Sequence, residues 1–270
     1  MASDERIYPF GYGSAATGMM ESRNARDNAG FLLTYLKPGM AVVDVGCGPG
    51  SITVGLAEAV VPGDVLGIDI EASHIALGQE RAASLGLDNC RFETASIFDL
   101  PLSDDSIDAV YGHTILMQFS DLDAVLREIK RVLKPSGLVG FREIDFGASL
   151  YHSDTSAFCQ LQQMLRRSIA HNDGNPDIGR SLPSILANAG FDILTTGVAY
   201  NVAPTPEAMA RRNAMMARVW EESEFPRQAE ALGWISSEDR ATMVSRLEEE
   251  ALDQGSFAAT TYVEVVGRLG

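Results

Sequence analysis

Strand-like runs alternate with helical patterns through the first half of the chain. Five short runs rich in Val, Ile and other apolar residues recur between residues 41 and 143, and longer segments with helical spacing separate them. This alternation is typical of repeated βαβ units, so it predicts an α/β fold with a mainly parallel sheet and helices on both faces. The runs are AVVDV (41–45), DVLGID (64–69), CRFET (90–94), IDAVYG (107–112) and GLVGFRE (137–143).

The clearest helical pattern covers residues 122–133. Its apolar residues recur every three or four positions and therefore share one face of a helix. Ser120, with Asp123 three positions later, predicts the N-terminal cap, and KPSG at 134–137 predicts the end of the helix.

The second half of the chain is mostly helical. Helical patterns at about 155–170 and at 182–189 precede a strand-like run at 191–198, and the last strand is expected at about 261–268. The chain shows no internal repeat and no low-complexity linker. We therefore expect one domain over residues 1–270, with an N-terminal cap segment (1–30) and a helical insertion (204–255). The insertion is either a lid over the active site or a packing element that covers a sheet edge.

Charge and composition exclude several classes of partner. The net charge of −16 would repel nucleic acid and anionic lipid, and no apolar run approaches the length that spans a bilayer. The polar, acidic start of the chain does not resemble a secretory signal, which favours a cytoplasmic protein. Three widely spaced cysteines predict neither a disulfide framework nor a metal site. A homodimer is left open.

Three glycines follow the first strand directly. Gly46, Gly48 and Gly50 stand where the strand at 41–45 should turn into a helix at 51–60. Glycine allows positive φ and lets a ligand approach the backbone closely, while the first N–H groups of a helix attract polar or anionic groups. The turn therefore predicts a ligand site.

Two acids narrow the choice of ligand. Asp69 closes the second strand about twenty residues after the glycines, where a carboxylate can bind both hydroxyls of a ribose. Asp44 lies inside a buried strand, where a carboxylate needs a cationic or hydrogen-bonding partner such as a ligand ammonium group. Position 51 is Ser instead of the last Gly of the dinucleotide fingerprint. A nicotinamide-dependent oxidoreductase is therefore the weaker alternative.

These motifs together resemble class I S-adenosylmethionine-dependent methyltransferases. VVDVGCGPG and GIDIEASHI are similar to the first two motifs of that family, and the segments 93–121 and 125–143 are similar to later regions of its ubiquinone/menaquinone-biosynthesis group. The resemblance covers about residues 20–145, and 180–200 more loosely. It implies a Rossmann-like sheet of seven strands, mostly parallel, whose last strand is antiparallel, with the helical insertion between the last two strands.

The resemblance also assigns a cofactor site. It implies that the glycine turn faces the methionine of S-adenosylmethionine, that Ile70 and His74 flank the adenine, and that Ser96 replaces the usual acidic contact to the adenine amino group. The residues implied to bind the cofactor are Tyr12, Arg23, Asp44, Gly46, Cys47, Gly48, Gly50, Asp69, Ile70, His74, Ser96, Ile97, Gly112 and His113. Tyr8, Tyr12 and Arg23 would face either the cofactor or the acceptor.

The expected activity is methyl transfer from S-adenosylmethionine to the O, N or C atom of a small organic acceptor. His113 is the candidate catalytic residue, either as a general base or as a shape and hydrogen-bonding element of the pocket, and Glu143 and His152 are further candidate bases. The methionines and Trp220 of the insertion fit either an acceptor pocket or a helical core. The alternative function is a protein that binds S-adenosylmethionine for another reaction or for structure.

Overall fold

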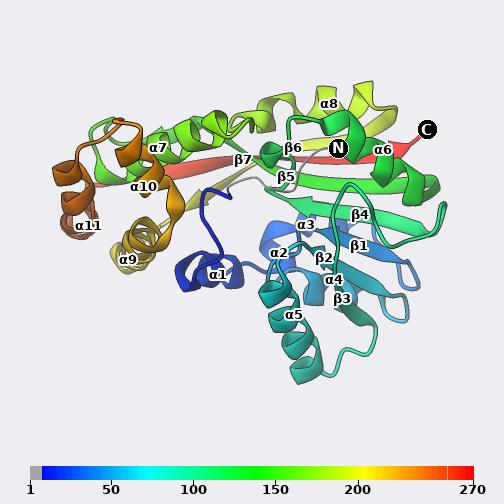
Figure 1. Ribbon diagram of the computed structural model, residues 1–270. Coiled ribbons are helices and arrows are strands. Elements are labelled where there is room, and N and C mark those ends of the chain that lie inside the picture. Colours follow the sequence, from blue (N-terminus) through cyan, green and yellow to red (C-terminus); the bar gives the residue numbers. More distant parts are fainter. Residues whose placement is uncertain (1–7, 254) are drawn as a thin grey trace.

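The computed structural model describes residues 8–253 and 255–270 and contains a seven-stranded sheet in the order β3-β2-β1-β4-β5-β7-β6 (Figure 1). The first five strands run parallel, and β7 lies antiparallel between β5 and β6, which confirms the expected fold. The strands are β1 (Val42–Val45), β2 (Val65–Asp69), β3 (Cys90–Thr94), β4 (Ile107–His113), β5 (Leu133–Tyr151), β6 (Phe191–Val202) and β7 (Ala258–Leu269).

The strand order reverses between β1 and β4. The chain passes from β1 outward to β2 and β3, and then returns to place β4 on the other side of β1. The connections leaving β1 and β4 therefore diverge, which leaves a crevice at the carboxyl ends of these two strands. This is the edge at which the glycine turn begins.

Helices bury both faces of the sheet in two separate cores. Val43 and Val45 of β1 belong to one core, whereas Val42 and its neighbours Val65 and Ala109 belong to the other. This two-sided burial explains why the parallel strands read as nearly continuous apolar runs. The helices are α1 (Ser14–Glu21), α2 (Ala25–Asn28), α3 (Gly30–Leu33), α4 (Thr53–Val60), α5 (Ala72–Leu85), η1 (Leu116–Gln118), α6 (Leu122–Val132), α7 (Ala157–His171), η2 (Ile178–Ser181) and α8 (Leu182–Asn188).

The N-terminal cap of α6 differs from the prediction by one residue. The side chain of Asp121, instead of Ser120, accepts a hydrogen bond from the backbone N–H of Ala124 at 3.0 Å. A carboxylate is the stronger acceptor because it is charged and lies at the positive end of the helix. The end of α6 at Val132 agrees with the predicted stop.

Three helices form the insertion between β6 and β7. They are α9 (Pro206–Glu222), α10 (Glu224–Ala231) and α11 (Ser237–Leu252), and they lie beside α7, on the side of the molecule away from β1–β3 (Figure 1). Met216 and Trp220 of α9 are buried in the larger core. The Met-rich face of the insertion therefore packs as a helical core. Among the described residues, no helix combines the length and apolar character that a membrane crossing requires.

Candidate cofactor and active site

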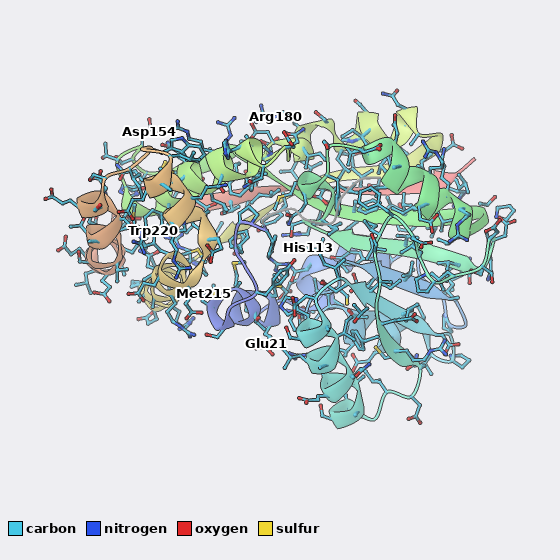
Figure 2. All side chains as sticks on the ribbon, in the orientation of Figure 1. Glu21, His113, Asp154, Arg180, Met215 and Trp220 are labelled. Atoms are coloured by element: carbon cyan, nitrogen blue, oxygen red, sulfur yellow. The ribbon has the colours of Figure 1, made fainter. Side chains whose placement is uncertain are left out.

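A pocket opens at the carboxyl ends of β1, β2 and β4. It encloses about 1340 Å³, including its open mouth. Its walls come from the N-terminal segment, the glycine turn, the loops after β2, β3 and β4, and the end of α7. His113 lies near the middle of the molecule, whereas Met215 and Trp220 lie farther out on the insertion side (Figure 2).

The glycine turn has the backbone that its sequence predicts. Gly46, Gly48 and Gly50 have φ values of 69°, 53° and 75°, in the region that other residues rarely adopt. A Cβ at Gly46 would stand 2.6 Å from Ile115 Cδ1, and one at Gly50 would stand 2.5 Å from Phe92 Cζ. Gly46 and Gly48 line the pocket, but Gly50 packs against Phe92 behind it.

Asp44 is a buried carboxylate on the pocket wall. Only 2% of its surface is exposed, and the Thr53 hydroxyl donates a hydrogen bond of 2.6 Å to its Oδ2 atom. Burial raises the pKa of Asp44 to about 7, since the charged form loses its hydration. No described Lys or Arg forms an ion pair with it. The pocket therefore contains an acid that a ligand cation would stabilise in its charged form.

Asp69 fixes the glycine turn to the next strand. Its Oδ2 atom accepts the backbone N–H of Gly48 at 2.9 Å, and its Oδ1 atom accepts that of Glu71 at 2.9 Å. Each carboxylate oxygen retains a further lone pair for a ligand hydroxyl. Asp69 also lines the pocket.

His113 is buried at the end of β4, with 7% of its surface exposed. Its Nε2 atom lies 3.3 Å from Asn28 Nδ2, and its Nδ1 atom lies 3.1 Å from Thr114 Oγ1. Burial, together with the charges of Arg23 and Arg142, holds the pKa of His113 well below its usual value. The imidazole is therefore neutral, and both ring nitrogens already have partners in the protein.

The other predicted residues divide between the pocket and its surroundings. His74 is buried and lies 3.2 Å, through Nε2, from the hydroxyl of Thr17. Gly112 does not line the pocket, because the Phe141 side chain occupies the space beside its Cα atom. The remaining predicted residues that line it are Tyr12, Arg23, Cys47, Ile70, Ser96 and Ile97.

Residues 8–12 cover one side of the pocket, and we call this segment the roof. Tyr8, Pro9 and Tyr12 line the pocket, and the rings of Tyr8 and Tyr12 stack with their centroids 5.4 Å apart. The Tyr12 and His74 rings also pack edge to face, with their centroids 5.7 Å apart. Residues 1–7 of the predicted N-terminal cap segment lie outside the described residues.

The two other candidate bases lie outside the pocket. Glu143 is fully buried and accepts the backbone N–H groups of Ile115 at 2.9 Å and Leu116 at 2.8 Å, so it fixes the start of η1. Burial raises the pKa of Glu143 to about 7. His152 is bonded to the backbone of Phe257, far along the sheet. Neither side chain lines the pocket.

Sequence reasoning did not name the residues on one side of the pocket, which we call the far wall: Phe98, Phe119, Ile169, Asn172 and Gly174. Thr114 follows the last residue of β4 with φ at 52°, a strained conformation for a β-branched side chain, and its N–H donates to Arg142 O. A motif search gives no signal for the α7 residues, because these join the pocket only through tertiary packing. The lining residues absent from the prediction are Pro9, Met20, Ser51, Ile52, Ile68, Ala95, Phe98, Thr114, Ile115, Gln118, Phe119, Ile169, Asn172 and Gly174.

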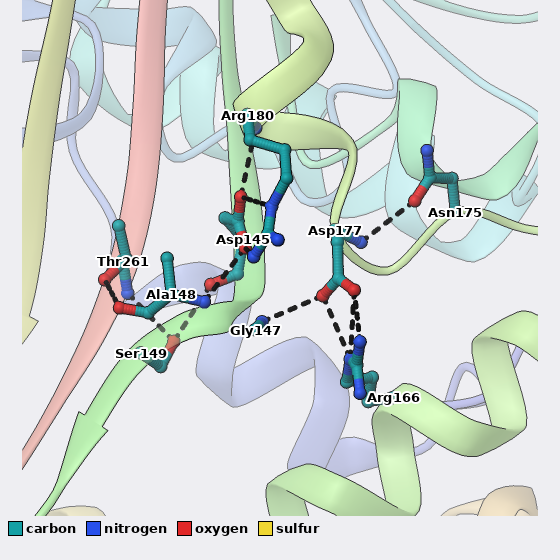
Figure 3. A network of polar contacts seen from close by, with 9 residues as sticks. All are labelled: Asp145, Gly147, Ala148, Ser149, Arg166, Asn175, Asp177, Arg180 and Thr261. Atoms are coloured by element: carbon teal, nitrogen blue, oxygen red, sulfur yellow. Dashed lines mark hydrogen bonds and ion pairs between the residues drawn. The ribbon is translucent and has the colours of Figure 1, made fainter.

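Two ion pairs hold the loop that follows α7. Arg180 binds Asp145 through Nε at 2.7 Å and Nη2 at 2.6 Å, and Arg166 binds Asp177, which also accepts the Gly147 N–H at 2.8 Å (Figure 3). The loop between these ion pairs carries Asn172 and Gly174 into the pocket. The network therefore ties the far wall to the bend in β5.

Comparison with known proteins decides the family. A family described as a methyltransferase domain matches residues 36–190, which is more than half of the chain. The chain belongs to this methyltransferase family. It is 33% identical, over 67% of its length and 66% of the relative's, to an uncharacterised methyltransferase of Schizosaccharomyces pombe. The chain thus covers slightly less than two thirds of that relative.

Two further similarities agree with this family. A demethylmenaquinone methyltransferase of Bacillus cytotoxicus is 35% identical over 40% of this chain and 51% of its own length. Geranyl diphosphate C-methyltransferase from Streptomyces coelicolor shares the fold, with a TM-score of 0.53, 20% identity, and coverage of 90% of this chain and 77% of that chain. The resemblance to class I methyltransferases is confirmed.

Proposed function

We propose that the pocket binds S-adenosylmethionine across the glycine turn and presents its methyl group to a small, largely apolar acceptor. The observation that carries the proposal is Asp44, a buried carboxylate that lines the pocket with no cationic partner among the described residues. The ammonium group of the methionine moiety would form an ion pair with this carboxylate.

Three charged side chains line the described pocket, and each can bind a different polar group of the cofactor. Asp44 would bind the ammonium group, and Arg23, the one Arg or Lys in the described lining, would bind the carboxylate. Asp69 would accept the ribose hydroxyls. The adenine would lie beside Ile70, His74, Ser96 and Ile97.

The far wall suits an apolar acceptor. The rings of Phe98 and Phe119 meet edge to face, 5.2 Å between centroids, and Ile169 adds an aliphatic surface. Asn172 supplies one polar group to orient a ligand. The relative named demethylmenaquinone methyltransferase supports a ring-containing lipophilic acceptor.

Methyl transfer depends mainly on how the acceptor is positioned relative to the methyl group. S-adenosylmethionine supplies an electrophilic methyl carbon on a sulfonium, which is an excellent leaving group. The walls of the pocket hold the acceptor in line with that carbon and exclude water, and such positioning can contribute roughly 7–11 kcal/mol. His113 serves as a hydrogen-bonding wall of the reaction site, since its neutral ring is bonded at both nitrogens.

Calorimetry with two ligands tests the charge assignment. S-adenosylhomocysteine and adenosine are titrated into the wild type, Arg23→Ala and the control Arg26→Ala, whose side chain is exposed on α2. We expect Arg23→Ala to weaken S-adenosylhomocysteine about tenfold or more, since it loses a charged hydrogen bond, and to leave adenosine unchanged. Equal losses for both ligands, or no loss relative to Arg26→Ala, would contradict the assignment.

A further inference from the structure

The insertion supports the pocket without lining it. No described residue of α9, α10 or α11 lines the pocket. Yet Glu222, Phe225 and Gln228, spaced three positions apart from the end of α9 into α10, contact helix α1, the roof residue Pro9 and the lining residue Asn172 in turn. We call these three residues the brace.

Glu222 caps α1 from the other end of the chain. The N-cap residue of α1 is Gly13, which has no side chain to accept the first N–H groups of the helix. Instead Glu222 Oε2 accepts the Ala15 N–H at 2.8 Å and the Ser14 hydroxyl at 3.0 Å. These hydrogen bonds lower the pKa of Glu222. A negative charge at this position also complements the helix dipole.

Phe225 holds the roof directly. Its backbone N–H donates to the carbonyl oxygen of Pro9 at 3.1 Å, and its fully buried ring packs edge to face with the ring of Phe10. Pro9 is a roof residue that lines the pocket. The chain just before α1 is therefore held at Pro9 and again at Ala15.

Gln228 reaches the far wall. Its Nε2 atom donates to Asn172 Oδ1 at 3.2 Å, while its Oε1 atom accepts the Ser168 hydroxyl at 2.6 Å. Asn172 lines the pocket. One short stretch of the insertion thus contacts both the roof and the far wall.

The other end of α1 is attached to the cofactor half. The Ser51 hydroxyl donates to Met20 O at 2.8 Å, and Glu21 pairs with Arg81 at 2.8 Å. Ser51 follows the glycine turn by one residue and lines the pocket. Helix α1 therefore links the insertion to the glycine turn, and its two ends depend on different halves of the molecule.

We propose that Glu222 is a positioning residue that holds α1 and the roof closed over the pocket and so controls how quickly a bound ligand leaves. Because Tyr8, Pro9 and Tyr12 cover one side of the pocket, movement of the roof would widen the route by which a ligand leaves. Loss of the Glu222 cap frees the start of α1 next to the roof. The identity of the ligand rests on the proposed function; the closure of the roof does not.

The test compares Glu222→Ala and Glu222→Gln with Glu221→Ala, a matched control on the same turn whose side chain is exposed. Amide hydrogen exchange of residues 8–20 is measured in the free protein, and the dissociation rate of S-adenosylhomocysteine is measured by stopped-flow competition. We expect Glu222→Ala to raise both rates about tenfold, with unchanged exchange in β1 and β4. Glu222→Gln keeps one acceptor oxygen and should give an intermediate result.

Two outcomes would overturn the proposal. One is exchange at residues 8–20 in Glu222→Ala that matches the Glu221→Ala control. The other is an increase in exchange that spreads equally to β1 and β4, which would make Glu222 a general stability residue. Failure of the wild type to bind S-adenosylhomocysteine would instead contradict the proposed ligand, and the exchange measurement would still decide the role of Glu222.

Discussion

The two sides of the pocket are built in different ways. On the proposed cofactor side, Gly46 and Gly48 lie in one short turn, and Asp69, which is only 21 positions after Gly48, closes the neighbouring strand. On the roof side, the corresponding contacts join residues far apart in the chain, as with Ala15 and Glu222, which are 207 positions apart.

Because of this difference, we expect the cofactor side to set ligand affinity and the roof side to set how readily the pocket opens. The cofactor side contains buried polar groups such as Asp44, whose charged form is destabilised by burial. A ligand cation that pairs with such a group would offset this unfavourable free energy. The roof side holds exposed or half-buried hydrogen bonds, which open at lower free energy. Changes on the first side should therefore alter affinity most, and changes on the second should alter rates of opening.

The largest effect is expected at Asp44. Asp44→Asn keeps the shape of the side chain and removes the charge that would meet the ligand ammonium. We expect the affinity for S-adenosylhomocysteine to fall about a hundredfold, near the upper range for a hydrogen bond to a charged group. Calorimetry against the exposed control Asp64→Asn measures it. A smaller loss of affinity in Asp44→Asn than in Glu222→Ala would contradict the view that the cofactor side sets affinity.

The pH dependence sharpens the same point. Because the pKa of Asp44 is about 7 in the free protein, the carboxylate becomes protonated below that pH. We expect affinity for S-adenosylhomocysteine to fall between pH 7 and 5, by at most about tenfold per unit, and to be flat in Asp44→Asn. A wild-type profile as flat as that of the variant would remove the ammonium assignment.

The stability of the free protein should depend on pH in the opposite sense to ligand affinity, falling as pH rises. The folded pKa values of Asp44 and Glu143 lie above their unfolded values. Their contribution is therefore fully present below the unfolded pKa, near 4, and is lost as pH rises through about 7. We expect the melting temperature of the free protein to fall from pH 6 to 8, and to fall less in Asp44→Asn. Melting curves by calorimetry check the sign.

Asp69→Ala should weaken the ligand roughly thirtyfold, which corresponds to about 2 kcal/mol. The variant loses the proposed acceptor of the ribose hydroxyls and also releases the Gly48 N–H. Calorimetry with adenosine, which retains the ribose, should show the same loss as S-adenosylhomocysteine. Unchanged affinity in the folded variant would remove the ribose assignment.

His113→Ala should lower kcat about tenfold, as expected for the loss of a positioned hydrogen-bonding wall, with a smaller effect on melting temperature. Because the pKa of His113 lies well below its usual value, its titration should be absent from the activity profile near pH 6.5. Steady-state rates with saturating S-adenosylmethionine test this once an acceptor is found. Wild-type turnover in the variant would reduce His113 to a packing residue.

The smallest effect is expected at Gln228. Gln228→Ala removes a neutral hydrogen bond to Asn172, worth about 1 kcal/mol. We expect amide exchange at residues 168–174 to rise a few fold, while affinity for S-adenosylhomocysteine stays within about twofold of wild type. A large loss of affinity would show that the far wall also belongs to the cofactor side.

The accuracy of the sequence interpretation follows the same division. The parallel strands and the conformation of the glycine turn could be predicted because apolar alternation and glycine act over a few residues. The cap of α6 was wrong by one residue because Ser120 and Asp121 are both good N-cap residues, and only the structure shows which side chain accepts the bond. Gly50 and Gly112 could not be separated from the lining glycines without the positions of Phe92 and Phe141.

The sequence alone indicated the family, the mainly parallel sheet and the two acids at its carboxyl edge, since these depend on apolar patterns, short spacings and the conformational freedom of glycine. Tertiary structure decided that Glu143 is used inside the fold, that α7 closes the far wall, and that Glu222 caps a helix at the opposite end of the chain. The physical reason is that packing between distant segments sets these contacts, and no local pattern records which segments will meet.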